Sequence, residues 1–456
     1  MVFWHKIGVN RRNRPHLEIR PGCFAPLAGV CLLLAAERNA WAQEALRMSM
    51  TGDLAAESQR RQSSALGYYN LLLGPTAWRF GSSLSLEYDD NVGLAQTGSE
   101  SDLIIRPGLN AQMHWPFSLQ NSLDFSLGAG YSEYLSHSDL NQFYLTPGSG
   151  FSFDIYAGAF KINLHDRISI TENAYESAGV SGNNQNLERL QNSAGTTVFW
   201  DMGKATASLG YDHGNYAALS QSQGTPDANS DNFYANTGFQ IQPELMVGLE
   251  AGDSLINYSQ TAAAEEYAGM NQWSLGVFGS SQISDHLSVR LDAGYTGNAT
   301  DGGGATLAPS DSSGFYFSSS LSHQVNARLN YTLAVGRSTD LAAYGELQTY
   351  YFVRLNPNFN IFEKCTISTP VWWQSGTEGA ASATQIPWPV RGFPPVVRSA
   401  QPNGDYVQYG LGLTISRPLT QHLSGNLSDQ YVHESANQGG VAYAVNIISL
   451  SFSYQF

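Results

Sequence analysis

Acidic and amide side chains gather at one point early in the chain. Asp89, Asp90 and Asn91 follow the stretch WRFGSSLSLEY, and Glu100 and Asp102 come soon after. A hard divalent cation binds clustered carboxylate oxygens, whereas Asp and Asn side chains also bond to nearby backbone N–H groups and so begin loops. Two interpretations of this cluster are therefore open. One is a weak metal site at Asp89 and Asp90, and the other is the start of a loop. We favour the loop start, because the spacing lacks the pattern of an established calcium loop.

Charged residues of both signs recur on the polar side of the alternating stretches described below. Opposed charges that face each other across a pore orient passing solutes and set selectivity. The same charges can instead pair along a wall and only stabilise it, and both interpretations are open. The candidates for a selective lumen are Arg79, Glu87, Arg106, Asp124, Lys161, Arg167 and Arg354.

The sequence gives little support to catalysis. Nucleophilic hydrolysis needs a Ser or an acidic residue with a His and an orienting partner. The 10 His residues are scattered and the G-x-S-x-G motif is absent. His114, His165 and His422 are more simply residues of a pore wall or of turns. We therefore expect neither enzyme activity nor a cofactor.

These side chains need strands to hold them on one face. In the last segment, IISLSFSYQF, apolar residues occupy every second position and Ser or Gln lie between them. Because side chains alternate between the two faces of a strand, one face is apolar and the other polar. The same pattern recurs from residue 77 to the C-terminus, for example in WRFGSSLSLEYDD, LIIRPGLNAQMHW, SLDFSLGAGY and VQYGLGLTIS.

Composition favours lipid rather than a protein core as the surroundings of the apolar faces. Charged residues make up 13% of the chain and aromatic residues 12%, and 45 of 456 residues are Gly. No run of about 18 apolar residues encodes a spanning helix. The polar faces carry Ser, Gly, Asn and Gln, which suits a barrel interior. We therefore predict an all-β fold, a transmembrane up-and-down antiparallel β-barrel, with a water-soluble sandwich as the alternative.

Short turns alternate with long polar loops, as an up-and-down barrel requires. The expected short turns are WPFSLQ, YAGAF, DMGKA, QPEL, QISDH, HQVNA, LNPNF and RPLTQ. They predict about 18 strands, with 16 as the fallback. Pro370 falls inside an expected strand and Asp166 falls on an expected lipid face. Each position marks either a bulge or an error in the strand assignment.

The N-terminal region is typical of an exported protein. A basic stretch, the apolar run FAPLAGVCLLLAA and the small-residue site AWA predict a signal peptide over residues 1–42, cleaved before Gln43. Residues 43–76 are expected to form a short periplasmic segment, and residues 77–456 the barrel. The formal net charge is −15, and it becomes more negative without the basic signal, which excludes nucleic acid as a partner.

The longest expected loop runs from Gly376 to Asn403. Its segment IPWPVRGFPPVV is apolar and rich in Pro, unlike the other loops. Exposed apolar segments usually cover something. The loop is a candidate constriction formed by Trp388, Arg391 and Phe393, and contact with polysaccharide or simple covering of the rim are the alternatives.

The ending with Phe452, Tyr454 and Phe456 resembles the C-terminal signal that the barrel assembly machinery of Gram-negative bacteria recognises. The segments LGPTAWRFGSSLSLEYDDNV and IIRPGLN resemble the beta-barrel porin-2 group of outer-membrane proteins, over residues 70 to 135. The resemblance implies a barrel without catalytic residues. It also implies, for some members, a link to exopolysaccharide export.

We therefore expect a porin-like passive channel of the outer membrane, with an accessory role in exopolysaccharide export as its specialised form. A non-conducting structural or surface-binding barrel with functional extracellular loops is the alternative. The expected partners are outer-membrane lipid and lipopolysaccharide, the barrel assembly machinery, and polysaccharide or small polar solutes.

Overall fold

The structure is a computed structural model. It describes residues 69–171, 189–219, 227–258, 269–300, 313–341, 347–361, 364–378, 385–386, 396–397, 404–436 and 442–456. In this part of the chain, no helix is long and apolar enough to cross a membrane. Residues 1–42, which contain the expected signal peptide, lie outside the described residues.

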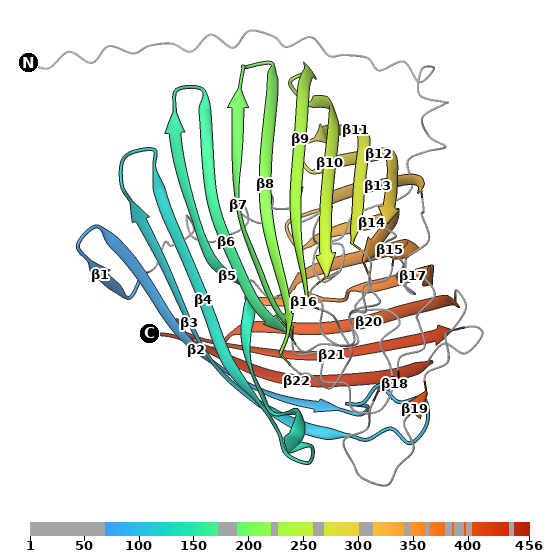
Figure 1. Cartoon of the computed structure of the whole chain (residues 1–456). Coiled ribbons are helices and arrows are strands. Elements are labelled where there is room, and N and C mark those ends of the chain that lie inside the picture. The colour runs from blue at the N-terminus through green and yellow to red at the C-terminus, as the bar shows by residue number, and fades with distance from the viewer. Residues whose placement is uncertain are drawn as a thin grey trace, which may run out of the picture. The chain divides into compact units, whose positions relative to one another are not determined.

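The described residues form a closed antiparallel β-barrel of 18 strands, each paired with its neighbour in the chain (Figure 1). This confirms the predicted fold class and strand number. β16 and β17 together make one barrel strand. The barrel strands are β2 Thr76–Asp89, β3 Asp102–Pro116, β4 Ser122–Tyr134, β5 Gln142–Ala157, β6 Phe160–Thr171, β7 Arg189–Asp201, β8 Ala205–Ala218, β9 Ala228–Gln242, β10 Leu245–Tyr258, β11 Met270–Ser284, β12 Leu287–Thr300, β13 Ser313–Gln324, β14 Leu329–Leu341, β15 Leu347–Ile361, β16 Cys365–Ser368, β17 Val371–Glu378, β20 Gly404–Pro418, β21 Leu423–Ala436 and β22 Tyr443–Gln455.

Four short elements lie outside these strands. β1 (Leu71–Leu73) forms a small hairpin with the start of β2, and the 3-10 helix η1 (Ser138–Leu140) lies between β4 and β5. β18 (Gln385–Ile386) pairs with β19 (Val396–Val397) inside the longest loop. We call the end of the barrel where β2 ends and β3 begins the outer end, and the end that carries the C-terminus the inner end.

The last strand closes the barrel against the first. β22 pairs with β2 from Gly81↔Gln455 to Asp89↔Ile447. The hydroxyls of Ser85 and Ser451 lie 2.8 Å apart on the inner face, and the Phe456 N–H donates to the Phe80 carbonyl over 3.2 Å. Closure leaves no unpaired edge, which is the condition for a sheet in lipid.

Two prolines interrupt the ladder without shifting its register. Pro357 lies inside β15 and Pro370 separates β16 from β17. The pairs Asn358↔Ser368 and Leu355↔Val371 keep the same register on both sides of the break. Of the two alternatives at Pro370, the bulge is therefore wrong. The expected turn LNPNF is also wrong, because these residues continue β15 beyond Pro357. Asn-Pro usually marks a turn, but here neighbouring strands hold it extended.

The irregularity near Asp166 lies in the neighbouring strand. Asp166 pairs directly with Phe151, whereas β5 carries two extra residues between Leu145 and Ser149 relative to both neighbours. Gly148 and Gly150 take φ values of 95° and 149° there, which side chains rarely allow. Of the two alternatives at Asp166, a bulge at that residue is therefore wrong.

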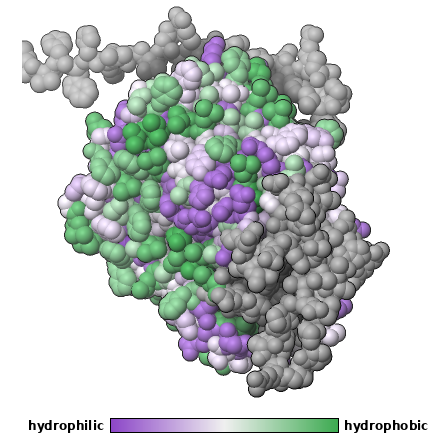
Figure 2. Space-filling view, in the orientation of Figure 1, coloured by the Kyte–Doolittle hydropathy of each residue, from purple (hydrophilic) through white to green (hydrophobic). Residues whose placement is uncertain are grey.

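The outward face of the barrel is apolar between two rims of aromatic rings. Leu109, Leu209 and Leu275 lie on this face and are at least 60% exposed. Figure 2 shows hydrophobic residues over much of the visible surface, interrupted by a hydrophilic area. Neighbouring rings contact each other along both rims. The pairs Tyr131–Phe143, Tyr211–Phe233, Trp273–Tyr295 and Tyr409–Tyr431 lie towards the outer end, and Trp115–Phe117, Phe160–Trp200 and Tyr454–Phe456 towards the inner end.

Aromatic rings on the inward face lie over glycines of the adjacent strand. Tyr234 covers Gly210 and Trp372 covers Gly410, in direct register in both cases. A Cβ at either glycine would overlap the ring. This packing accounts for part of the high Gly and Tyr content, because each ring needs a neighbour without a side chain.

Candidate functional site

The candidate site is the inner wall of the barrel. The register places the seven expected lumen residues, Arg79, Glu87, Arg106, Asp124, Lys161, Arg167 and Arg354, on the face opposite the exposed hydrophobic residues. The contacts of each side chain decide which of these charges reach the lumen, because a charge that is paired within the wall is neutralised there.

Glu87 and Arg106 form an ion pair across β2 and β3. Arg106 also donates through Nε to the hydroxyl of Ser132 over 3.1 Å. Both charged side chains are largely buried, at 17% exposure for Arg106 and 13% for Glu87. This pair belongs to the wall, because each charge faces its partner rather than the open lumen.

Asp124 and Lys161 also have partners in the wall. Asp124 Oδ1 lies 2.6 Å from His114 Nδ1 on the adjacent β3. The Lys161 ammonium lies 4.0 Å from the Asp154 carboxylate and keeps 21% of its side chain exposed. The carboxylate of each pair is almost fully buried.

A hydrogen-bonded row of polar side chains continues from Asp154 along the wall. Asn163 donates through Nδ2 to Ser152 and to Asp154, over 2.7 and 2.8 Å. Its Oδ1 therefore faces His165 Nδ1 at 2.9 Å, and His165 Nε2 lies 2.6 Å from Asp212 Oδ1. We call this row, Asp154, Ser152, Asn163, His165 and Asp212, the polar belt. The belt is buried throughout, so its carboxylates contribute little charge to the lumen.

The three remaining candidate arginines have no carboxylate at ion-pair distance among the described residues. Arg354 lies over the ring of Phe352, 5.4 Å from its centroid. Arg167 has buried Nε and Nη2 atoms without a hydrogen-bond partner in the described part of the chain. Together with Arg79, these residues leave positive charge on the same inner face as the paired carboxylates Glu87, Asp124 and Asp154.

A further inward arginine was not among the four arginines that the sequence predicted. Arg290 on β12 pairs with Asp292, with Nη2 2.6 Å from Oδ1, and its guanidinium lies 4.6 Å from the ring centroid of Phe278. Glu250 accepts a hydrogen bond from the Tyr316 hydroxyl over 2.7 Å beside it. The alternation in LSVRLDAGY places Arg290 on the polar face, so the available signal was the same as for the chosen residues.

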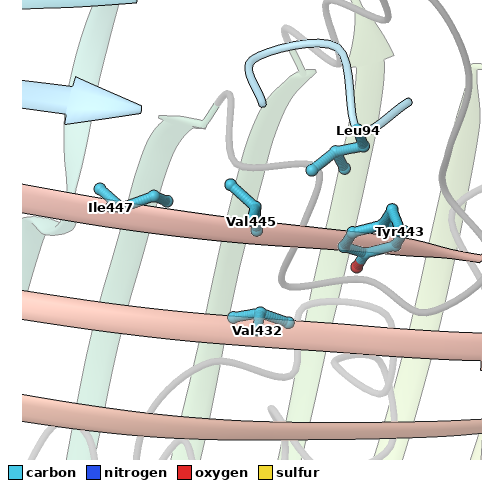
Figure 3. Packing of buried hydrophobic residues seen from close by; sticks show 5 residues of the cluster. All are labelled: Leu94, Val432, Tyr443, Val445 and Ile447. Atoms are coloured by element: carbon cyan, nitrogen blue, oxygen red, sulfur yellow. The ribbon is translucent and has the colours of Figure 1, made fainter. Parts of the chain in front are cut away.

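The loop between β2 and β3 lies against the inner wall near the outer end (Figure 3). Leu94 is 4% exposed and packs against Val432, Tyr443, Val445 and Ile447. Its φ of 47° is unusual for a residue with a side chain, so the packing holds a strained backbone in place. No pattern in the sequence pointed to this inward loop.

Asp89, Asp90 and Asn91 fix that loop to the barrel. Asp89 Oδ1 accepts from the Asn91 N–H over 2.8 Å, and Asp90 Oδ1 accepts from the Asn446 N–H over 2.7 Å. Asn91 Nδ2 donates to the carbonyl of Ala444 over 2.8 Å. These bonds are those of a loop start. In the described part of the chain, no group of three acidic, His or Cys side chains is arranged to hold a metal ion.

The remaining expected sites lie in the last third of the chain. Trp388, Arg391 and Phe393 lie outside the described residues, and their role in a constriction stays a prediction. Phe452, Tyr454 and Phe456 face outward at the inner end, and the rings of Tyr454 and Phe456 lie 5.3 Å apart. Their role in assembly also stays a prediction.

No protein-family model matches the sequence, and no curated protein matches it. The solved structures that are similar include the following three. The outer membrane protein OpdK from Pseudomonas aeruginosa has a TM-score of 0.48 at 10% identity, over 83% of this chain and 99% of that one. OccK2 from Pseudomonas aeruginosa, in complex with glucuronate, has 0.46 at 10%, over 85% and 100%. OccAB3 from Acinetobacter baumannii has 0.45 at 8%, over 84% and 100%.

Proposed function

We propose that this chain is an outer-membrane channel through which small polar solutes diffuse without a chemical step. The proposal rests on one observation, the difference in polarity between the two faces of the closed sheet. The outward face is apolar between two aromatic rims, and the inward face carries polar and charged side chains. Barrels of about 16 to 18 strands leave an aqueous lumen.

The charges on the inner face support a preference for anions. Glu87, Asp124 and Asp154 each have a cationic or His partner in the wall. Arg79, Arg167 and Arg354 have no such carboxylate partner among the described residues, so their charge is not compensated locally. Positive charge along a lumen lowers the energy of a passing anion and raises that of a cation. The negative net charge of the whole chain does not oppose this, because local charges dominate within a Debye length.

Planar-bilayer recording with purified full-length mature protein tests both statements. We expect stable conductance, and a reversal potential in a KCl gradient that shows chloride to be more permeant than potassium. Liposome swelling with neutral sugars measures the open lumen independently. A protein that inserts into bilayers but neither conducts nor admits sugars would be the alternative, a non-conducting structural or surface-binding barrel.

Export and assembly complete the proposal. Residues 1–42 act as the signal peptide, and mass spectrometry of the outer-membrane protein should find Gln43 at its N-terminus. Phe452, Tyr454 and Phe456 act as the signal for the assembly machinery, and lipid and lipopolysaccharide surround the barrel.

The accessory role in exopolysaccharide export rests on the family resemblance alone. Loss of exported polymer on deleting the gene, restored by the intact gene, would support it.

A further inference from the structure

Among the described barrel strands, only β2 and β22 pair without a chain segment that joins them directly. We call this pairing the seam. Every other pairing in the barrel joins strands that are neighbours in the chain, so the connection between them limits their register. The register of the seam must be set by contacts of its own. It matters for the whole molecule, because the stagger of the strands fixes the tilt and the width of a closed barrel.

The alternation of side chains does not choose one register for the seam. Ser85 pairs with Ser451 on the inward face. If β22 moved by two residues towards the inner end, Ser451 would face Ser83 instead. Serine would still meet serine inside the barrel, and the outward leucines of both strands would still meet apolar partners, because a shift by two residues keeps every side chain on its face.

Hydrogen bonds at the outer end of the seam do not settle the register alone. The Asp90 N–H donates to the Asn446 carbonyl over 3.2 Å, and Asp90 Oδ1 accepts from the Asn446 N–H over 2.7 Å. A shift of β22 towards the inner end would break these bonds. It would also bring β22 alongside residues 76–80 of β2, where new ladder bonds could replace them. Whatever lies beside those residues therefore decides whether the shift can occur.

β1 lies in the place that the shifted strand would take. β22 pairs with β2 from Asp89 to Gly81, whereas β1 pairs with β2 from Trp78 to Thr76. β3 pairs with β2 from Ala77 onwards and so occupies the other edge. β1 and β22 therefore follow each other along one edge of β2, and both β1 and the C-terminus lie at the inner end of the barrel (Figure 1).

Asn70 fills the position between β1 and the C-terminus. Its Nδ2 donates to the Phe80 carbonyl over 2.9 Å, and its Oδ1 accepts from the Phe80 N–H over 3.0 Å. The side-chain amide thus makes both bonds that a residue of a paired strand would make. The Phe456 N–H donates to the same Phe80 carbonyl over 3.2 Å. Asn70 and the last residue of the chain therefore meet at Phe80.

Apolar packing does not explain the presence of β1. Its three residues, Leu71–Leu73, are each at least 40% exposed. The turn to β2 is well defined, since Gly74 has a φ of 58° and the Thr76 hydroxyl donates to the Leu73 carbonyl over 2.8 Å. The simpler interpretation is that β1 covers an edge of β2 that would otherwise be unpaired. That interpretation predicts no change of register when β1 is detached.

We propose that Asn70 and β1 form a register stop for the closing strand. β22 can slide along β2 towards the inner end only until Phe456 meets Asn70. The stop and the bonds of Asp90 thus hold the two ends of the seam. This inference goes beyond the proposed channel and does not depend on it, because a barrel that does not conduct must close in the same way.

Disulfide formation across the seam reports its register in the mature protein folded into liposomes. Cys365→Ser first removes the one cysteine of residues 43–456. Ser85→Cys with Ser451→Cys reports the observed register, because the two hydroxyls lie 2.8 Å apart. Ser83→Cys with Ser451→Cys reports the register shifted by two residues. Mass spectrometry of linked peptides after oxidation measures both, and with native β1 we expect only the first pair to link.

Asn70→Ala with Gly74→Val opens the stop, because it removes the side-chain amide and disfavours the positive φ of the turn. β1 lies outside the 18 barrel strands, so the barrel should still fold, and linkage of the shifted pair should rise about tenfold. Asn326→Ala with Gly158→Val is the matched control. Asn326 Oδ1 accepts from two backbone N–H groups in the turn between β13 and β14, and Gly158 has a φ of 64° in the turn between β5 and β6. The control should link only the first pair.

A folded Asn70→Ala, Gly74→Val protein that links only Ser85→Cys to Ser451→Cys would overturn the stop and leave β1 as the cover of a strand edge. If that double variant fails to insert, Asn70→Ala alone decides the question. It removes only the two side-chain bonds, so shifted linkage should rise about threefold, and an unchanged ratio of the two linkages would overturn the stop. The observed linkage in a protein that does not conduct would contradict the channel but not the stop.

Discussion

His165 and Asp212 lie two strands apart on the inner wall and still approach to 2.6 Å. The residue between them in register is Gly195 on β7. Because glycine has no side chain, the His165 ring and the Asp212 carboxylate meet above the β7 backbone. Both are almost fully buried, so the pair ties three strands together through a gap that one glycine provides.

Replacing Gly195 should therefore destabilise the barrel. In Gly195→Ala, the new Cβ would overlap both Asp212 Oδ1 and the Tyr211 carbonyl. Because either the buried pair must separate or the backbone must move, we expect a loss of about 2 to 4 kcal/mol in the free energy of unfolding. Urea titration of the protein in lipid vesicles measures it. Gly279→Ala is the matched control, since a Cβ there meets nothing. Equal stability of the two variants would show that the gap at Gly195 is unimportant.

The Arg106–Glu87 pair offers a direct test of lumen charge. Glu87→Gln removes the carboxylate and leaves the Arg106 guanidinium without its ion-pair partner. The permeability ratio of chloride to potassium should rise roughly twofold, because one more positive charge in the wall is left uncompensated. Arg354→Gln should lower the same ratio. Reversal potentials in a KCl gradient measure both, and parallel shifts in the two variants would contradict the assignment of charge.

Leu94 should control how firmly the loop between β2 and β3 stays on the wall. Leu94→Asn keeps a residue type that tolerates positive φ but places a polar group in an apolar cluster, at a cost of about 2 kcal/mol. We expect more frequent current fluctuations and a larger mean conductance in single-channel records. Leu119→Asn, at a fully exposed position in the turn between β3 and β4, is the control and should behave as the native protein. If Leu94→Asn shows no more current fluctuations than the native protein, the hydrogen bonds of Asp90 and Asn91 are sufficient to hold the loop on the wall.

Alternation along each strand was enough to predict which residues face inward. It assigned Arg79, Arg106 and Arg354 to the inner face from single segments, because the period of two is local. It did not reveal which of these charges are paired. Asp212 contacts His165 only because Gly195 lies between them in register, and that register depends on three strands together. No periodic pattern in the sequence marks Leu94 as an inward residue, because one apolar residue in a polar loop is common.

The segment LNPNF was assigned to a turn because Asn-Pro is locally a turn signal, whereas pairing with β14 and β16 keeps it in β15.

A pH dependence should arise at His137, in the outer connection between β4 and η1. Its Nδ1 lies 2.9 Å from Asp102 Oδ2 and its Nε2 2.8 Å from Glu100 Oε2. The hydrogen bond to Asp102, and then that to Glu100, raises the pKa of His137 above its ordinary value. A His with a raised pKa in the folded protein contributes its full stabilisation below about pH 6.5 and loses it as the pH rises through the raised pKa. Glu100 belongs to the same loop as Leu94, so this ion pair is a second attachment of that loop.

We therefore expect few current fluctuations at pH 5, and more of them as the pH rises above about 6.5 and the loop loses this attachment. Single-channel recording at constant ionic strength between pH 5 and 9 measures the change. His137→Asn should show the high-pH level of fluctuation throughout, because a neutral amide makes no ion pair with Glu100 or Asp102. His286→Asn, in the exposed turn between β11 and β12 at the other end of the barrel, should keep the native profile. If His137→Asn keeps that profile as well, some other group controls the loop and the attachment at His137 has no effect on conduction.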